Sequence, residues 1–199
     1  MRARMVLAYT NTQIELREIS LRDRPAELYK ASKKGTVPIL ITIDDLVIDE
    51  SLDIMLWLLE NKQNQTWLSK DSKEELHLIN ENDTTFKKWL DRYKYHERYP
   101  EHSKEYYREN CCNILSHYED QLNNTKYLQK NDISIADIAI FPFVRQFANI
   151  DCKWFENNYN QLVQWLENIC SSDLFLSIMG KYDIWRIDDE PQIIDFNTL

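Results

Sequence analysis

The hydrophobic and polar positions of the first sixty residues change their period from one stretch to the next. Some stretches alternate apolar and polar residues, as half-buried strands do, and others repeat apolar residues every three or four positions, as amphipathic helices do. The elements predicted in this way are a helix at 2–9, a strand at 14–19, a helix at 25–30, strands at 35–42 and 46–48, and a helix at 51–61. The predicted order is therefore α-β-α-β-β-α.

From residue 71 onward the pattern is helical. Apolar and aromatic residues recur at helical spacing from Asp71 to roughly Tyr99, where Pro100 ends the helix, and again in a second long stretch that begins at Ser103. Shorter helices are expected at 134–150, 159–170 and 173–179. Because two long antiparallel helices open a helical bundle, the sequence predicts a small α/β domain followed by an all-α domain.

A serine and an aspartate in the second half have the spacing of a helix capping box. Ser134 can cap the helix that follows it, and Asp137 can return a hydrogen bond to the backbone N–H of Ser134. Ile133 and Ile138 have the spacing of the hydrophobic staple that often accompanies such a box. We therefore expect a helix to begin at Ser134.

The balance of charge changes near residue 70. The chain carries a net charge of −9, and residues 1–70 hold ten basic and ten acidic side chains, so all the excess acid lies in residues 71–199. This distribution disfavours binding of nucleic acid through phosphate contacts. With the polar stretch before it, the change indicates a first domain at 1–61, a linker at 62–71 and an all-α domain at 72–199.

The cysteines and the apolar runs indicate the cellular compartment in which the protein is expected. No apolar run approaches the length of a membrane-spanning helix, and the first residues lack the apolar core and cleavage site of a signal peptide. The four cysteines and four histidines are scattered, which supports neither a zinc site nor a disulfide framework. We expect free thiols in a reducing cytoplasm, with no bound metal and no membrane contact.

Candidate chemistry begins at a glycine and a proline in the third predicted element. Gly35 suits a turn that needs freedom in φ, and Pro38 cannot donate a hydrogen bond within a strand. X-Pro is the common place for a cis peptide bond, and a cis bond at Val37–Pro38 would turn the N–H and C=O of Val37 outward. An extended peptide could then pair with Val37 as an added strand.

A second stretch follows about a dozen residues later. Glu50 and Ser51 stand at the start of an apolar helical run, where free backbone N–H groups and the helix dipole favour a carboxylate. Backbone pairing at one end and a helix N-terminus at the other favour a small acidic peptide as ligand. A simpler interpretation is that Glu50 and Ser51 only begin a helix.

The run from Gly35 to Leu40, followed by Asp49-Glu50-Ser51, resembles the glutathione-binding half of the cytosolic glutathione transferases. The capping box of Ser134 and Asp137 resembles the one that supports folding of the helical domain in that family. The resemblance implies a thioredoxin-like domain before the helical one and glutathione as the substrate. In that case Val37 and Pro38 would meet its cysteinyl backbone, Glu50 and Ser51 its γ-glutamyl end, and Lys34 its glycyl carboxylate. The alternative for Lys34 is that it is a solvated surface residue without a role in binding.

The resemblance also implies an activity and an assembly. The full-length protein would be a cytoplasmic homodimer that transfers glutathione to a small electrophile or reduces mixed disulfides with it. Trp89 and Tyr93 lie on the helix that would face the cleft and are candidates for a hydrophobic substrate site, although aromatic residues at helical spacing are more often core. The alternative is a scaffold of the same fold that binds a protein partner, as in relatives of stringent starvation protein.

The chain departs from the family pattern at its beginning. In the family a strand precedes the first helix, and the catalytic Cys, Ser or Tyr lies between them, whereas here the first residues already read as that helix. The arginines of this helix resemble the glutaredoxin-like branches, in which a Cys precedes it. We expect an N-terminally shortened sequence, for example from a misplaced start at Met1, and the alternative is a chain that closes the gap by another route. The catalytic residue and the activity of this chain are therefore left open.

Overall fold

A computed structural model describes residues 1–69 and 71–196, and the chain divides into two compact units. The first unit consists of Met1–Gln65 and Ser172–Leu199, and the second consists of Thr66–Ser171. The predicted helical domain runs over 72–199, whereas by contacts the chain from Ser172 groups with the N-terminal residues. The predicted domain bounds stay a prediction. Lys70 of the predicted linker and residues 197–199 of the predicted domain lie outside the described residues.

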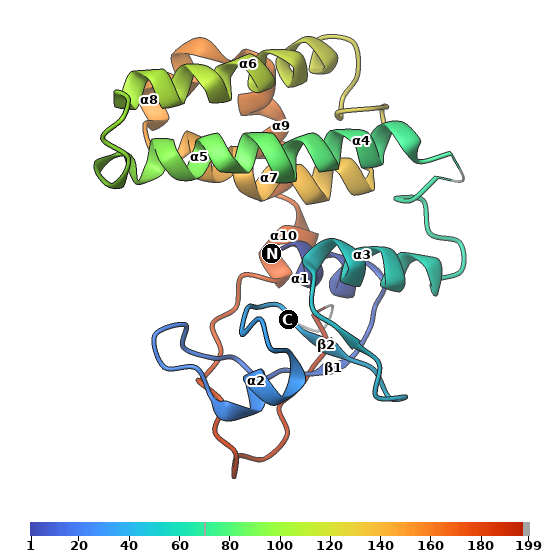
Figure 1. Cartoon of the computed structure of the whole chain (residues 1–199). Coiled ribbons are helices and arrows are strands. Elements are labelled where there is room, and N and C mark those ends of the chain that lie inside the picture. Colours follow the sequence, from blue (N-terminus) through green and yellow to red (C-terminus); the bar gives the residue numbers. More distant parts are fainter. Residues whose placement is uncertain (70, 197–199) are drawn as a thin grey trace. The chain divides into compact units, whose positions relative to one another are not determined.

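The N-terminal part of the first unit has the predicted order of elements (Figure 1). The elements are α1 (Arg2–Tyr9), β1 (Ile14–Glu15), α2 (Ala26–Ala31), β2 (Leu40–Ile41), β3 (Val47–Ile48) and α3 (Ser51–Glu60). Two elements from the end of the chain complete the unit: α10 (Asp173–Ser177) and β4 (Ile193–Ile194). The helices match the predicted ones within a residue or two, while the strands are shorter because few of their backbone groups find a partner.

The core of the first unit lies between its helices. α1 packs along α3 and also contacts α10. Met5 and Val6 on α1 are fully buried, as is Met55 on α3. Burial of each such side chain contributes about 1.5–3 kcal/mol, so this helix pair supplies much of the stability of the unit.

The C-terminal tail supplies a strand to this unit. β4 runs antiparallel to β1, with Ile14 opposite Ile194 and Glu15 opposite Ile193. Further along, the N–H of Trp185 donates to the C=O of Glu18 over 2.7 Å. These contacts join residues that are 167 to 180 positions apart, and a local sequence pattern carries no signal for such a pairing.

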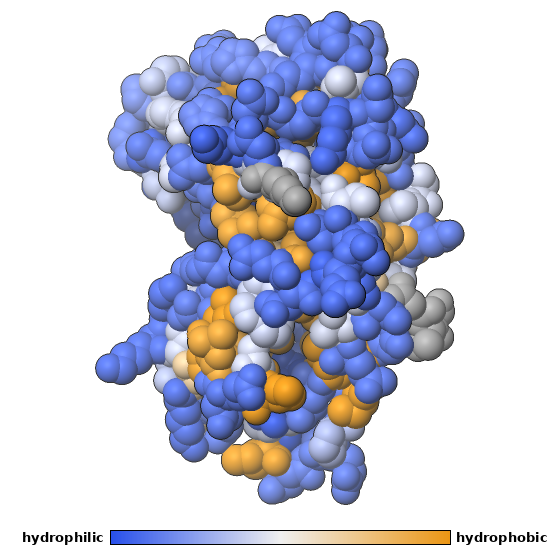
Figure 2. Space-filling view, turned by 90° about the vertical axis from the view of Figure 1, so that its right-hand side faces the viewer, coloured by the Kyte–Doolittle hydropathy of each residue, from blue (hydrophilic) through white to orange (hydrophobic). Residues whose placement is uncertain are grey.

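The second pair of strands forms a separate hairpin. β2 pairs antiparallel with β3, and the turn between them places Asp45 at a φ of 60°. The hairpin carries apolar side chains on its surface: Ile43 is completely exposed, and Leu46 is half exposed. Apolar groups of this kind interrupt the hydrophilic surface in several places (Figure 2).

The second unit is helical. Its elements are α4 (Lys73–Glu81), the π-helical turn η1 (Asn82–Phe86), α5 (Lys87–Lys94), the 3₁₀ turn η2 (His96–Arg98), α6 (Lys104–Leu122), α7 (Ile135–Ala148), α8 (Cys152–Asn158) and α9 (Asn160–Cys170). Helix α8 was not predicted from the sequence. The signal that could have revealed it is Asp151, an N-cap residue whose side chain accepts a hydrogen bond from the N–H of Trp154 at 3.1 Å. α6 begins directly after Ser103, as predicted, and the side chain of Ser103 caps it.

The predicted helix from Asp71 to Tyr99 is interrupted. A π-helical turn at Asn82–Phe86 separates α4 from α5, and α5 ends at Lys94. A π-turn inserts one residue and rotates the apolar face, so both halves can point their apolar residues into the core. Asn82 and Phe86, at the ends of this turn, are fully buried. The periodicity of the sequence predicts one continuous helix here, because the apolar residues keep helical spacing both before and after the π-helical turn.

The capping box at the start of α7 is present as predicted. The carboxylate of Asp137 accepts hydrogen bonds from the N–H of Ser134 at 2.9 Å and from its hydroxyl at 2.8 Å. It also accepts from the N–H of Leu128 and from Nε1 of Trp165 on α9, both at 2.9 Å. Burial raises the pKa of Asp137, and these four donors oppose the shift. Asp137 thus ties a loop and two helices together.

We expect Asp137→Ala to lower the free energy of unfolding by about 2–5 kcal/mol, because it leaves several buried donors without an acceptor. Asp132→Ala is the matched control, since Asp132 is exposed in the same loop and should change stability by no more than about 0.5 kcal/mol. Urea denaturation followed by circular dichroism measures both. Equal midpoints for the two variants would contradict the role assigned to Asp137.

We expect Phe196→Ala to destabilise the first unit by about 3 kcal/mol, because Phe196 in the tail is only 1% exposed. The control is Ile193→Ala, which removes a side chain that is 55% exposed. Native-state hydrogen exchange at the amides of α1 reports the stability of this unit. Unchanged protection of α1 in Phe196→Ala would show that the tail is not part of its fold.

Candidate functional site

The N-terminus of α3 forms one side of the candidate site. Glu50 occupies the N-cap position with extended backbone angles, and its C=O accepts the first helical hydrogen bond, from the N–H of Ile54 at 3.0 Å. Its side chain makes no capping bond to α3 within the described residues. The first N–H groups of α3 therefore face outward with the positive end of the helix dipole, an arrangement that favours an anion such as a carboxylate.

Two acidic side chains beside this helix end hold a lysine. Nζ of Lys34 donates to Oε1 of Glu50 at 2.7 Å and to Oδ1 of Asp49 at 3.0 Å. The hydroxyl of Ser32 donates to the other carboxylate oxygen of Asp49 at 2.5 Å. In the structure Lys34 pairs with these two carboxylates and stays half exposed, and its predicted contact with the glycyl carboxylate of a ligand stays a prediction.

These contacts shift the pKa values of the charged groups. Glu50, followed by Asp49, raises the pKa of Lys34 above its ordinary value. The hydrogen bond from Ser32, with that from Lys34, holds the pKa of Asp49 below its usual range. Lys34 and Asp49 therefore carry their full charge at neutral pH. Asp49 and Ser32 were missed as members of the site, although Asp49 lies directly before the predicted pair.

A buried arginine lies behind Ser51. Nη1 of Arg2 donates to Oγ of Ser51 over 3.4 Å, and Arg2 is only 7% exposed. α1 brings this guanidinium to the start of α3, because the two helices pack together. Sequence reasoning missed Arg2, since nothing in a helical pattern shows which neighbour an arginine will meet.

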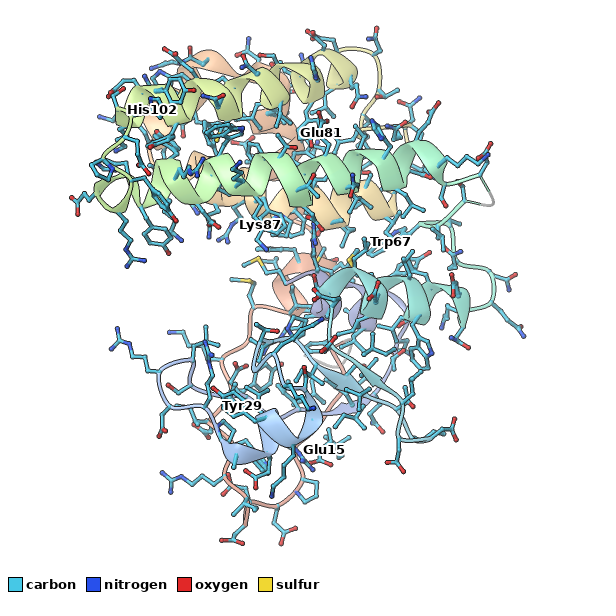
Figure 3. The ribbon with its side chains drawn as sticks, viewed as in Figure 1. Glu15, Tyr29, Trp67, Glu81, Lys87 and His102 are labelled. Atoms are coloured by element: carbon cyan, nitrogen blue, oxygen red, sulfur yellow. The ribbon has the colours of Figure 1, made fainter. Side chains whose placement is uncertain are left out.

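The turn before β2 forms another part of the site. Gly35 has a φ of 61°, and a Cβ atom added there would lie 2.4 Å from the ring of Tyr29 on α2 (Figure 3). This left-handed conformation favours glycine, and a larger residue would also require the ring of Tyr29 to move. The peptide bond between Val37 and Pro38 is cis, and Val37 is 46% exposed. No backbone hydrogen bond from the described residues engages Val37, so its N–H and C=O are available to an extended ligand.

The two aromatic candidates belong to the second unit. Tyr93 is 2% exposed, lies 5.3 Å from Phe147 between ring centres, and has a pKa raised by burial. Trp89 is partly exposed and stacks with Tyr107 on α6 at 6.4 Å. Tyr93 thus contributes to the core of the helical unit. A role of Trp89 and Tyr93 in binding a hydrophobic substrate stays a prediction.

The cysteines and the metal-ligating side chains offer no further reactive cluster among the described residues. All four cysteines are free thiols, and all lie in the second unit: Cys111, Cys112, Cys152 and Cys170. Among the described residues, no group of three or more His, Cys, Asp or Glu side chains could hold a metal ion. In the same part of the chain, no helix has the length and apolar character to cross a membrane.

Comparison with known proteins points to one family in both halves. Residues 1–66 match the model of the glutathione S-transferase N-terminal domain, and residues 80–173 match that of the C-terminal domain. A curated relative, glutathione S-transferase F13 of Arabidopsis thaliana, is 31% identical over 70 residues, which are 35% of this chain. The aligned segment spans about a third of that relative, 32% of its length.

Solved structures share the fold over most of the chain. Glutathione transferase URE2P6 of Phanerochaete chrysosporium, in complex with oxidised glutathione, is 16% identical with a TM-score of 0.77, over 89% of this chain and 88% of that one. A family member from Pseudomonas fluorescens with two glutathione molecules bound is 16% identical with a TM-score of 0.75, over 89% and 86%. Glutathione transferase F7 of Populus trichocarpa is 20% identical with a TM-score of 0.73, over 89% and 91%.

These likenesses establish the fold as a thioredoxin-like N-terminal domain with a small sheet, followed by a helical domain. They agree with the sequence resemblance found at the Gly35 turn and at the capping box of Ser134. Since the two domain models together match most of the residues in the expected order, the chain belongs to the glutathione S-transferase family.

Proposed function

We propose that this chain binds glutathione through Val37, Pro38, Glu50 and Ser51. The observation that carries the proposal is the outward-facing N-terminus of α3 in the same unit as the exposed backbone of Val37. The contact between Lys34 and Glu50 connects the two parts, because Lys34 lies three residues before Val37. Two structures with this fold hold glutathione, which supports the same ligand here.

Each part of the ligand has a matching group. The γ-glutamyl carboxylate would accept hydrogen bonds from the first N–H groups of α3 and from the hydroxyl of Ser51. The γ-glutamyl ammonium would pair with the carboxylate of Glu50. The cysteinyl backbone would pair with the N–H and C=O of Val37 as a short added strand. Together these contacts would fix the ligand at both ends of its γ-glutamyl-cysteine portion.

We further propose that the family's activity, transfer of glutathione to an electrophile or reduction of mixed disulfides, belongs to the full-length protein as a cytoplasmic homodimer. Either reaction needs the glutathione thiolate, stabilised by a donor near the N-terminus of α1. The cysteines of the described chain lie in the second unit and are not candidates for that place. The catalytic group is therefore not assigned to any described residue.

The second candidate function is a scaffold that binds a protein partner. The β2–β3 hairpin favours it, because the hairpin presents Ile41, Ile43, Leu46 and Val47 on its surface. Exposed apolar side chains of this kind are typical of protein contacts. The two functions are separable, since the hairpin surface does not include Glu50 or Ser51.

We expect Glu50→Gln and Ser51→Ala each to weaken glutathione binding about tenfold, because each removes a partner of a charged group on the ligand. The control is Glu60→Gln, the same change at the exposed opposite end of α3. Isothermal titration calorimetry gives the dissociation constants. Binding that is unaltered in both site variants would contradict the proposed site.

We expect brief alkylation with iodoacetamide at pH 8 to modify Cys152 and to spare Cys111. Cys152 is exposed, whereas Cys111 is fully buried and burial raises its pKa, so its reactive thiolate is scarce at that pH. Mass spectrometry of tryptic peptides identifies the modified thiol, and Cys152→Ser serves as control. Alkylated protein should keep its glutathione affinity, and loss of binding would mean that a thiol belongs to the site.

A further inference from the structure

The carboxylate assigned to the ligand's ammonium group already holds an ammonium group in this structure. Nζ of Lys34 lies 2.7 Å from Oε1 of Glu50, the distance of a direct, charge-assisted hydrogen bond. The amino group of a γ-glutamyl compound is also a primary ammonium. Two groups of the same chemistry, one from the protein and one from the ligand, therefore share one acceptor.

The lysine has a second partner that the ligand would not touch. Nζ of Lys34 lies 3.0 Å from Oδ1 of Asp49, and Ser32 holds the other oxygen of that carboxylate. The N–H of Lys34 also donates to Oγ of Ser32 at 3.3 Å. If Lys34 leaves Glu50, its pair with Asp49 can persist, so the departure breaks one contact of two.

The pair is exposed enough to exchange. The side chain of Lys34 is 50% exposed and that of Glu50 is 59% exposed. Ion pairs between such exposed side chains contribute little to stability, since water solvates both charges well. The pair therefore lowers the affinity of Glu50 for another cation without closing the site to it.

We propose that Lys34 is an internal competitor for the ligand's ammonium group, which holds Glu50 when the site is empty and moves to Asp49 alone when a γ-glutamyl compound binds. This inference rests on the proposed glutathione site. Binding then exchanges one partner of Glu50 for another, so the ligand gains less than it would from a free carboxylate. The penalty applies only to ligands that carry the amino group.

The test uses two ligands that differ only in that group. They are γ-glutamylcysteinamide and glutarylcysteinamide, which keeps the terminal carboxylate and lacks the amino group. Neither carries a carboxylate at its other end, so a contact of Lys34 there cannot mask the effect. The variants are Lys34→Met and its control Lys33→Met, which removes the same charge from the neighbouring exposed residue. Calorimetry measures the dissociation constants of both ligands for the unmodified protein and for each variant.

We expect Lys34→Met to bind γ-glutamylcysteinamide about two- to fivefold more tightly than the unmodified protein, a change in line with the strength of an exposed ion pair. The preference for this ligand over glutarylcysteinamide should rise by the same factor, and Lys33→Met should leave it unchanged. An unchanged or reduced preference in Lys34→Met overturns the inference while the glutathione site stands. If neither the unmodified protein nor Lys33→Met binds the γ-glutamyl ligand, the proposed function fails, and the inference fails with it.

Discussion

The helical unit depends on the buried carboxylate of Asp137. Asp137 has no exposure to solvent, and a charged group in that place is stable only when its oxygens are fully hydrogen-bonded. Its four donors come from Leu128, Ser134 and Trp165, which lie in a loop, at a helix start and on a second helix. Satisfying one carboxylate thus fixes the relative positions of three segments. Packing of the apolar residues around them follows from that arrangement.

The same requirement shapes the first unit through its backbone. Strand β1 has two residues, and its edge groups need hydrogen-bond partners. The tail supplies these partners at Ile193–Ile194, which pair with β1. It does so again at Trp185, whose N–H donates to the C=O of Glu18. The first unit is therefore built from both ends of the chain, and the helical unit is an insertion between them.

Local patterns determined the parts of the fold that depend on neighbouring residues. The order of elements up to α3, the start of α6 after Ser103 and the box at Ser134 and Asp137 could all be predicted, because each rests on spacing within a few positions. The glycine at position 35 could be predicted as well, since its turn requires a positive φ. These features follow from periodicity and capping chemistry alone.

Long-range and subtle features could not be predicted in this way. The pairing of β1 with β4 joins distant segments, and the π-turn at Asn82 leaves the apolar spacing on either side intact. At the candidate site the sequence indicated Glu50 and Ser51 together with Lys34, Val37 and Pro38, but not the contacts that these residues make within the protein. The contacts of Lys34 with Glu50 and of Arg2 with Ser51 depend on how α1, α3 and the turn before β2 come together.

The place of β4 also sets an order of events during protein synthesis. α1 and β1 are translated before the helical unit, yet the partner of β1 is translated only after it. Residues 66–171 are complete earlier, so the helical unit can fold while the first unit still lacks a strand. The usual vectorial order, in which the N-terminal domain folds first, is thus reversed. A nascent chain that has emerged from the ribosome as far as Ser171 would carry a finished helical unit together with an incomplete N-terminal one.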